Sequence, residues 1–377
     1  MDKNNNFRDC LSTLKKQNNL RCIATDSSEY ALDLSSNDYL GLSSDVRLYD
    51  DFLKELQQNR FPFSASSSRL LLKNAQGHHN LEQLLASCYN AEACLIFNSG
   101  YQCNVGVISA LASKNDLILA DKFVHASCMD GALLSKATLK RYQHLNYEHL
   151  EQLLERYRKE YENVFIITES IFSMDGDRAD LEKLVALKNQ YKAFLYVDEA
   201  HAVGVRGRNG LGCLEEVGLI DQVDFIVGAF GKALASVGGF IVCSALIKSF
   251  LINHARSFMY STALPPVNIA WTHFVVERLS DFKIRRLTLE NTSREFSNLI
   301  GVKTQSNIIP YIVGSNSHAM ELASNLKKEG FNVLPIRTPT VPENTARLRF
   351  SLAANHSIKN LLPIKNILIK YENKMVK

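Results

Sequence analysis

The sequence lacks the features that mark several common protein classes. Its longest apolar region, residues 225–247, is interrupted by Lys232, four glycines and small polar residues, so we do not expect it to span a bilayer. No run of five basic residues occurs and the net charge is only +4, which argues against nucleic acid as a partner. The N-terminal residues are polar and lack the apolar stretch of a signal peptide. These absences predict a globular cytoplasmic protein with neither a nucleic-acid nor a membrane partner.

Paired cysteines are also missing. None of the eight cysteines forms a Cys-x-x-Cys motif, and several lie inside apolar runs, so we expect reduced core thiols of a cytoplasmic protein. What the chain does have is an ordinary globular composition, with 46% hydrophobic and 22% charged residues. Its 377 residues suffice for two or three domains with a large core. The small positive charge would suit an anionic substrate or an acidic carrier protein.

Segments with strand and helix patterns alternate from about residue 80 to residue 250. Short apolar runs predict strands at residues 93–97, 117–120, 164–168, 193–197 and 224–227. Helical spacing of apolar residues predicts helices at 81–88, 104–112, 147–161 and 181–191, the last one capped by Asp180. This alternation predicts an α/β fold with a mostly parallel central sheet that helices cover on both faces.

The pattern changes on either side of that region. Before it, residues 7–20 have the spacing of an amphipathic helix. After Pro265 and Pro266 we expect a long helical stretch to about 300, a helix from a Ser317 cap to Gly330, and strands at 331–335 and 346–352. A last helix is expected at 362–373, with Pro363 in its first turn. We therefore predict an N-terminal segment (1–45), a large domain (46–258) and a smaller α+β C-terminal domain (259–377).

Two charged residues follow two of the expected strands. Asp198 comes directly after the run at 193–197, and Lys232 follows the run at 224–227. If both strands belong to one parallel sheet, the carboxylate and the amine reach the same edge. Pyridoxal phosphate chemistry needs such a pair, because an amine binds the aldehyde and a carboxylate keeps the pyridine nitrogen protonated. Either residue taken alone is equally compatible with a surface charge at a loop entry.

The same residues also resemble nucleotide-binding motifs. Asp198 to His201 spells the acidic box of a helicase, and Gly231–Lys232 resembles the end of a phosphate-binding loop. That loop requires a glycine five residues before the Gly-Lys pair and a Ser or Thr after it. Ile226 and Ala233 occupy those places, and the two motifs come in the reverse of the usual order. The glycine-rich stretch 204–212 lacks the dinucleotide-binding spacing. We therefore reject both ATPase activity and NAD binding.

Longer motifs follow one another along nearly the whole chain, at residues 36–42, 97–102, 121–127, 168–177, 198–201, 260–262 and 336–349. Together with Lys232 they make the chain similar to the α-oxoamine synthase family, whose members are fold-type-I, aminotransferase-like pyridoxal phosphate enzymes. The resemblance extends from about residue 20 to about residue 368. It implies pyridoxal 5'-phosphate as the cofactor, no metal, a homodimer, and a cofactor-binding role for residues 46–258.

The resemblance implies a role for each matching residue near the cofactor. The catalytic residues would be Lys232, which binds the cofactor, Asp198, which faces the pyridine nitrogen, and His125, which stacks on the ring. The other expected cofactor contacts are Gly100, Tyr101, Ser173, His201 and Thr262. Gly100 opens an expected helix, which suits phosphate binding by backbone amides. His201 would bond the ring hydroxyl, and Thr262 would reach the phosphate across the dimer interface.

The resemblance also assigns residues to the substrates. Arg349 would hold the amino-acid carboxylate in a bidentate pair that a lysine cannot copy, with Asn37 and His125 beside it. Thr340 would contact substrate, and Arg21 the acyl group. From the residues alone, Asn37 is more typical of a turn than of a substrate contact, and His125 is more typical of a polar loop.

The motif at residues 336–342 resembles two branches of the family, the oxononanoate and the sphingoid-base branch, more than the glycine acetyltransferase branch. We expect the activity of the oxononanoate branch, which joins L-alanine to a pimeloyl thioester carried by coenzyme A or by an acyl carrier protein. Two sister activities stay open: a glycine C-acetyltransferase, and a synthase that uses a longer acyl-CoA to make an aminoketone signal. A non-catalytic family subunit is a minor alternative, which the presence of Lys232, Asp198, His125 and Arg349 argues against.

Two positions depart from the family pattern. Serines replace the usual glycines in residues 63–69, and Leu72-Lys73 stands where a Ser-Gly pair is expected. Because the far end of the pimeloyl chain is polar, Lys73 and Arg21 are candidates to contact it, although a solvated surface charge is the more typical role of each. Ala229 stands in place of a phosphate-binding Thr, and the missing hydrogen bond would cost about 1.5–3 kcal/mol of cofactor binding.

Overall fold

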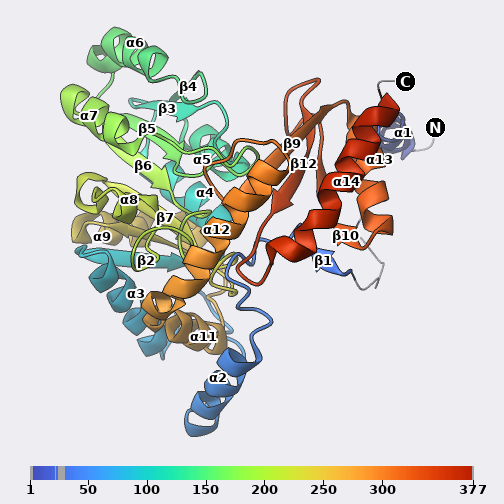
Figure 1. Cartoon of the computed structure of the whole chain (residues 1–377). Helices are drawn as coiled ribbons and strands as arrows, with labels where there is room; N and C mark the ends of the chain where they lie inside the picture. Colours follow the sequence, from blue (N-terminus) through green and yellow to red (C-terminus); the bar gives the residue numbers. More distant parts are fainter. Residues whose placement is uncertain (1–2, 22, 24–29, 376–377) are drawn as a thin grey trace. The chain divides into compact units, whose positions relative to one another are not determined.

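The computed structural model describes residues 3–21, 23 and 30–375 (Figure 1). Its internal contacts divide the chain into two compact units. The large unit comprises Asp38–Ser173 and Asp177–Leu287, and the small unit comprises Met1–Asn37, Met174–Gly176 and Thr288–Lys377. Each unit has its own sheet, because the apolar side chains of each must be buried by elements of the same unit.

A seven-stranded sheet forms the centre of the large unit. Its strand order is β2 (Ala93–Phe97), β8 (Gly239–Cys243), β7 (Phe225–Ala229), β6 (Phe194–Asp198), β5 (Val164–Glu169), β3 (Leu117–Asp121) and β4 (Thr138–Tyr142). Strand β8 pairs antiparallel with β2 and β7, while the other neighbouring pairs are parallel. The predicted α/β fold with a mostly parallel sheet is confirmed.

The large unit also contains helices, several of which connect these strands and pack against the sheet (Figure 1). They are α2 (Val46–Gln58), α3 (Gln76–Cys88), α4 (Gly100–Leu111), α5 (Ala126–Ser135), α6 (Tyr147–Tyr157), α7 (Leu181–Tyr191), α8 (Cys213–Glu216), α9 (Ala245–His254), α10 (Arg256–Met259) and α11 (Pro266–Glu277), with α12 (Lys283–Leu299) leading into the small unit. Short 3-10 turns lie at Arg158–Glu160, Ile220–Gln222 and Leu279–Phe282.

One continuous core lies between the sheet and helices α4 and α5. Alternate residues of the strands, such as Ile118 and Ala120 or Phe165 and Ile167, point into it, as the period of two in a strand requires. The first helix of this layer, α4, begins at Gly100, four residues before the predicted start, because the Ser99 side chain accepts a hydrogen bond from the Gln102 amide and caps it. The core therefore fixes α4 and α5 against the strand ends.

The small unit has two separate sheets. Strand β1 (Leu32–Asp33) pairs parallel with β10 (Phe331–Asn332), and β11 (Leu334–Ile336), β12 (Ala346–Ser351) and β9 (Ile308–Gly314) form an antiparallel sheet in that order. Its helices are α1 (Asn5–Lys16), α13 (Asn316–Lys328) and α14 (Ile358–Met375). The strand predicted at 331–335 is therefore two short strands that pair with different partners.

Two helix starts in the small unit correct the predictions. Ser315, rather than Ser317, caps α13, because its hydroxyl accepts from the His318 amide at 3.2 Å. Helix α14 begins at Ile358 after Ser357, whose hydroxyl accepts from the Asn360 amide at 3.4 Å. Pro363 consequently lies inside the helix rather than in its first turn. In both cases a serine close in sequence to the expected start provides the first capping contact.

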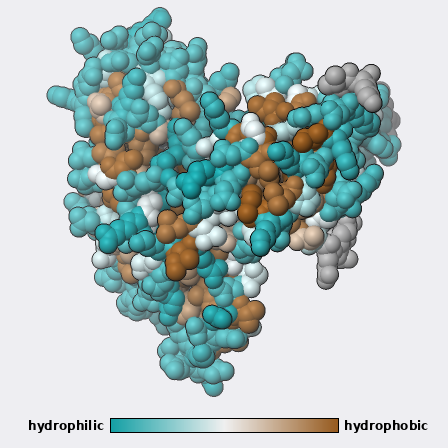
Figure 2. Space-filling view, viewed as in Figure 1, coloured by the Kyte–Doolittle hydropathy of each residue, from teal (hydrophilic) through white to brown (hydrophobic). Residues whose placement is uncertain are grey.

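The surface and the cysteines agree with a globular protein. On the face shown in Figure 2, hydrophilic side chains cover most of the surface and apolar ones gather in separate groups. None of the described helices is long and apolar enough to cross a membrane. The seven cysteines in the described part of the chain are all free thiols; Cys10 is exposed rather than part of the core, and Cys22 lies outside the described residues.

Candidate active site

Two neighbouring strands of the large unit end beside one another and carry the predicted acid and amine. Strands β6 and β7 are parallel, with Asp198 opposite Val227, so both end at the same edge of the sheet, as predicted. Asp198 is 5% exposed and is the last residue of β6. The Ala200 amide donates to its Oδ1 at 2.9 Å and the Asn104 side chain donates to its Oδ2 at 2.8 Å. Lys232 follows the end of β7 and is half-buried.

His125 lies at the start of α5, directly after strand β3. It is the N-cap residue of α5, and its Nδ1 accepts from the Ser127 amide at 3.2 Å and lies 2.7 Å from the Ser127 hydroxyl. Desolvation lowers the pKa of His125, and the positive charge of Lys232 lowers it further, against the opposite effects of Asp198 and Asp130. The Tyr101 ring meets the imidazole edge-on at 6.5 Å. A neutral, oriented imidazole results.

Glu169 is the strand neighbour of Asp198 and is almost fully buried. It pairs with Asp198 across β5 and β6, is 2% exposed, and its Oε1 has no hydrogen-bond partner. Burial raises the pKa of Glu169 well above its usual value, the Asp198 charge adds to this, and the Lys232 charge opposes it. Because Lys232 and Asp198 influence both Glu169 and His125, the four groups form one electrostatically coupled cluster.

The N-terminus of α4 provides a close, small-residue surface. A Cβ added to Gly100 would lie 3.3 Å from the Ala229 side chain, and one added to Gly239 would lie 2.8 Å from the Gly100 backbone. The side chain of Asn98 donates to the Thr262 carbonyl, and Thr262 forms an isolated antiparallel β-bridge with Ser68. Backbone amides at the first turn of a helix have no partner within the helix and favour an anion such as phosphate. Gly100 and Tyr101 thus stand where a phosphate group would fit.

The remaining large-unit residues that were singled out in the sequence are buried. His201 is 6% exposed, and its Nδ1 lies 2.6 Å from the Tyr39 hydroxyl. Ser173 is 8% exposed and lies in the turn that follows β5. Tyr39 belongs to the motif at 36–42, but no sequence pattern connects it with His201.

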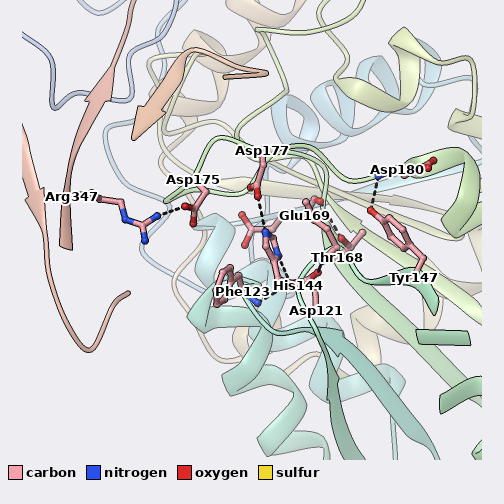
Figure 3. Close-up of polar contacts among 11 residues, drawn as sticks. Asp121, Phe123, His144, Tyr147, Thr168, Glu169, Asp175, Asp177, Asp180 and Arg347 are labelled. Atoms are coloured by element: carbon pink, nitrogen blue, oxygen red, sulfur yellow. Dashed lines mark hydrogen bonds and ion pairs between the residues drawn. The ribbon is translucent and has the colours of Figure 1, made fainter. Parts of the chain in front are cut away.

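A histidine between two carboxylates holds the turn that carries Ser173 (Figure 3). His144 Nδ1 lies 2.8 Å from Asp121 Oδ1, and its Nε2 lies 2.7 Å from Asp177 Oδ2. Burial alone would lower the pKa of His144, but the two carboxylates outweigh it and raise the pKa to about 9. Asp177 in turn accepts the Phe172 amide on its backbone carbonyl at 3.0 Å. His144 is therefore an imidazolium at neutral pH.

All the predicted substrate residues except His125 lie in the small unit. Both terminal nitrogens of Arg349 lie 3.2 Å from Asn37 Oδ1, and Arg349 is only 3% exposed. Arg21 donates to the Thr340 hydroxyl at 3.0 Å, and both residues are exposed. The structure thus brings together Asn37 with Arg349 and Arg21 with Thr340. Arg347, which sequence reasoning did not single out, pairs with Asp175 (Figure 3).

Sequence reasoning missed a buried polar chain behind Asp198 and His125. It consists of Tyr196, Asn104 and Ser127, which are 1%, 2% and 0% exposed. Two signals could have indicated it: Tyr196 shares a strand face with Asp198 by the period of two, and Asn104 is a polar residue inside an apolar helix. His144 gave no local signal, because its partners come from residues 121 and 177.

Comparisons with known proteins agree with this arrangement. The family model for class I and II aminotransferases matches residues 30–364. An 8-amino-7-oxononanoate synthase from Haemophilus ducreyi is 49% identical over 338 residues, which cover 86% of this chain and 87% of that protein.

Two solved structures extend the comparison. The 8-amino-7-oxononanoate synthase of Francisella tularensis is 30% identical with a TM-score of 0.76, covering 92% of this chain and 100% of that chain. A serine palmitoyltransferase variant from S. paucimobilis with a bound PLP–myriocin aldimine is 26% identical with a TM-score of 0.88, covering 99% and 98% of the two chains.

The chain therefore belongs to the class I and II aminotransferase family. Within that family its similarity is to the 8-amino-7-oxononanoate synthases, as the sequence motifs predicted. This membership confirms the predicted fold-type-I architecture and the prediction that the chain is an enzyme.

Proposed function

We propose that the protein is a pyridoxal phosphate-dependent enzyme that condenses L-alanine with a pimeloyl thioester, with loss of carbon dioxide, to give 8-amino-7-oxononanoate for biotin biosynthesis. The observation that carries this proposal is the coupled cluster of Asp198, Lys232, His125 and Glu169 at one edge of the large-unit sheet. The thioester would come on coenzyme A or on an acyl carrier protein, both anionic, which the net charge of +4 suits.

The large-unit residues fit this cofactor. Asp198 is a buried carboxylate that would hold a proton on the pyridine nitrogen, and His201 lies on the same loop for the ring hydroxyl. A side chain at Gly100 would crowd Ala229, at 3.3 Å, and its absence would let a phosphate group approach the backbone amides, with Tyr101, Ser173 and Thr262 as further proposed contacts. The orphaned Oε1 of Glu169 is a buried polar atom that lacks a partner. These features support residues 46–258 as the cofactor-binding part.

The chain's own residues would divide the chemistry among them. When bound, pyridoxal phosphate supplies an aldehyde for the amino group and a ring that withdraws electrons from the alanine Cα. Lys232 holds the cofactor and then, as a free amine, takes the proton from the alanine Cα. Arg349, kept in place by Asn37, binds the alanine carboxylate until carbon dioxide leaves. His125 stacks on the ring and helps to orient the substrate.

The proposed contacts to the acyl group lie in the N- and C-terminal parts, 1–45 and 259–377, with Lys73 of the large unit as a further candidate. Arg21 and Thr340 form one hydrogen-bonded pair there, which supports a shared role in contacting the acyl substrate. Lys73 is exposed in the large unit and lines a cavity of about 840 Å³ together with Leu72, Arg60 and His273. Its role at the far end of the pimeloyl chain stays a proposal.

Replacing Lys232 tests the cofactor chemistry. The purified enzyme should show the visible absorption band of lysine-bound cofactor, and Lys232→Ala should lack both the band and turnover. Lys248→Ala is a matched control, because Lys248 pairs with buried Glu82 away from the cluster and its removal should leave the band intact. Wild-type turnover by Lys232→Ala would refute the proposal.

A comparison of kcat/KM values for different substrate pairs separates the sister activities. Alanine, glycine and serine should be supplied in turn with pimeloyl, acetyl and palmitoyl thioesters, on coenzyme A and on an acyl carrier protein. We expect alanine with a pimeloyl thioester to give the highest kcat/KM. A higher value for serine with palmitoyl-CoA would favour a serine palmitoyltransferase, which the structural similarity keeps as the second candidate.

We also propose that the enzyme is a cytoplasmic homodimer. Several large apolar side chains of the large unit are strongly exposed, including Phe63 (87%), Leu71 (73%), Leu133 (67%) and Leu134 (63%). Exposed apolar groups of this kind favour a protein interface, and free thiols suit the cytoplasm. Analytical ultracentrifugation should give a dimer; a monomer at micromolar concentration would contradict the proposal.

A further inference from the structure

A chain of polar side chains runs through the apolar core behind the site. Tyr196 on β6, Asn104 on α4 and Ser127 on α5 are each at most 2% exposed, and their neighbours in this layer are apolar residues such as Val107, Cys128 and Phe225. Burying polar groups is unfavourable unless each finds a hydrogen-bond partner. Here every group does, and the chain connects Asp198 to His125.

The charge of Asp198 fixes the direction of every hydrogen bond in this chain. A carboxylate only accepts, so the Asn104 amide nitrogen must face Asp198 Oδ2, at 2.8 Å. The amide oxygen is then turned to the Tyr196 hydroxyl, which donates to it at 2.6 Å. With the amide turned the other way, its oxygen would face the carboxylate and the Tyr196 hydroxyl would lose its acceptor.

The second hydrogen of the Asn104 amide determines the proton on His125. It is donated to the Ser127 hydroxyl oxygen at 2.9 Å, so the hydroxyl hydrogen of Ser127 points elsewhere, to His125 Nδ1 at 2.7 Å. The Ser127 backbone amide donates to the same Nδ1 at 3.2 Å. A ring nitrogen that accepts from two donors carries no hydrogen, so in the neutral ring the proton is on Nε2.

We propose that Tyr196, Asn104 and Ser127 are positioning residues that, together with the Asp198 carboxylate, fix His125 as the neutral imidazole with its proton on Nε2. The groups whose charges act on His125 are Asp198 and Asp130, which favour an imidazolium, and Lys232, which opposes it. Burial of the ring has a larger effect than any of these charges and also opposes the imidazolium, so the pKa of His125 is lowered.

This tautomer would serve the proposed reaction. The tautomer itself follows from the hydrogen bonds, and only its role in catalysis rests on the proposed function. A neutral ring can stack on a pyridine ring whose nitrogen Asp198 keeps protonated, whereas an imidazolium would repel that positive charge. The Nε2 hydrogen is then a donor for a substrate oxygen. The Asp198 carboxylate, which would keep the cofactor's pyridine nitrogen protonated, thus also determines, through Asn104 and Ser127, which ring nitrogen of His125 carries the proton.

Nitrogen NMR of the cofactor-free enzyme tests the tautomer directly. With 15N-labelled histidine, the ring nitrogens of His125 can be assigned by their absence in His125→Asn. We expect an unprotonated Nδ1 and a protonated Nε2 at neutral pH. A proton on Nδ1, or a charged ring, in the wild-type protein would overturn the proposal without any variant.

Two variants test the chain itself. In Asn104→Asp the new carboxyl group must share one proton with the Asp198 carboxylate and has no second hydrogen to donate, so it accepts the Ser127 hydroxyl. Ser127 must then accept from His125 Nδ1, and the share of Nδ1–H rings should rise about tenfold. Tyr196→Phe removes the hydrogen bond to the amide oxygen of Asn104 and keeps an aromatic ring in the place where the Tyr196 ring lies 6.2 Å from that of Phe225. It should also raise the share of Nδ1–H rings, but by less than Asn104→Asp does.

Tyr89→Phe is the matched control, because it removes an equally buried hydroxyl that donates to the Leu211 carbonyl at 2.8 Å. Its His125 spectrum should equal that of the wild type. Identical spectra for Asn104→Asp, Tyr196→Phe and Tyr89→Phe would refute the proposed role of the polar chain. If the spectra shift as expected but Lys232→Ala keeps wild-type turnover, the proposed function is wrong, whereas the proposed role of the polar chain is supported.

Discussion

His144 makes a prediction that can be worked out from its surroundings. The ring is 16% exposed and lies between the Asp121 and Asp177 carboxylates at 2.8 and 2.7 Å. It also packs against Phe123 and Phe172, each at 4.5 Å between ring centroids. Its pKa rises from 6.5 to about 9, because two carboxylates favour the charged ring more than burial disfavours it.

The size and sign of the stabilisation follow from this pKa. The difference between 6.5 and about 9 corresponds to about 3 kcal/mol. A histidine whose pKa is higher in the folded state stabilises that state fully below about pH 6.5, and the stabilisation is lost as the pH rises through about 9. His144→Gln keeps hydrogen-bonding groups without the charge, so its cost should be about 3 kcal/mol larger at pH 6 than at pH 10.

Hydrogen exchange can measure this effect locally in the turn that His144 holds. The amides of Phe172 and Ala179 donate to the carbonyls of Asp177 and Ser170 at 3.0 and 3.1 Å and should lose protection in His144→Gln at pH 6. Protection is compared after correction for the intrinsic exchange rate at each pH. His149→Gln is the control, since His149 only accepts a backbone amide, from Gln143 at 3.0 Å. A loss of the same size at pH 6 and pH 10 would show that His144 acts through packing rather than charge.

Three further changes have defined outcomes. Gly131→Ala should lower the free energy of unfolding by about 1–3 kcal/mol in denaturant titrations, because its Cβ would lie 2.9 Å from the Asn104 carbonyl, whereas Gly77→Ala, with 3.5 Å to its nearest atom, should not. Arg21→Ala should raise the KM for the pimeloyl thioester and leave that for alanine unchanged; an unchanged thioester KM would return Arg21 to the surface. Ala229→Thr should lower the Kd for pyridoxal phosphate about 10- to 150-fold, measured by fluorescence titration, and no tightening would remove residue 229 from the phosphate site.

Local sequence patterns were sufficient for the large-unit sheet. Residues 93–97 and helix Leu181–Tyr191 were predicted with the bounds that the structure has, since a short apolar run and a capped 3.6-residue period are properties of neighbouring residues. Strand β4, whose residues are mostly half-buried, and the antiparallel β8 were not predicted. Strand β8 is as apolar as its neighbours, but its residues lie within the longer apolar region around Lys232, where the sequence alone marks no strand boundary.

The motifs also indicated the family and the pair Asp198 and Lys232. This pair could be predicted because residues that follow neighbouring parallel strands lie at the same edge of the sheet. What the motifs did not contain were the partners of those residues. Tyr39 beside His201 and Arg347 beside Asp175 each join segments that lie far apart in the sequence.

The sequence by itself thus determined the strands, most of the helices, the family and the residues that are candidates for chemistry, since each depends on short stretches of chain. Only the tertiary structure decided which polar groups share hydrogens. Asn104, Ser127 and Tyr196 meet because α4 and α5 pack on the face of β6 that also carries Asp198. His144, which follows β4, meets Asp121 and Asp177 because β3 lies between β4 and β5 in the sheet. The proton positions on His125 and His144 depend on these contacts, because a hydrogen bond exists only where the fold brings donor and acceptor within about 3 Å.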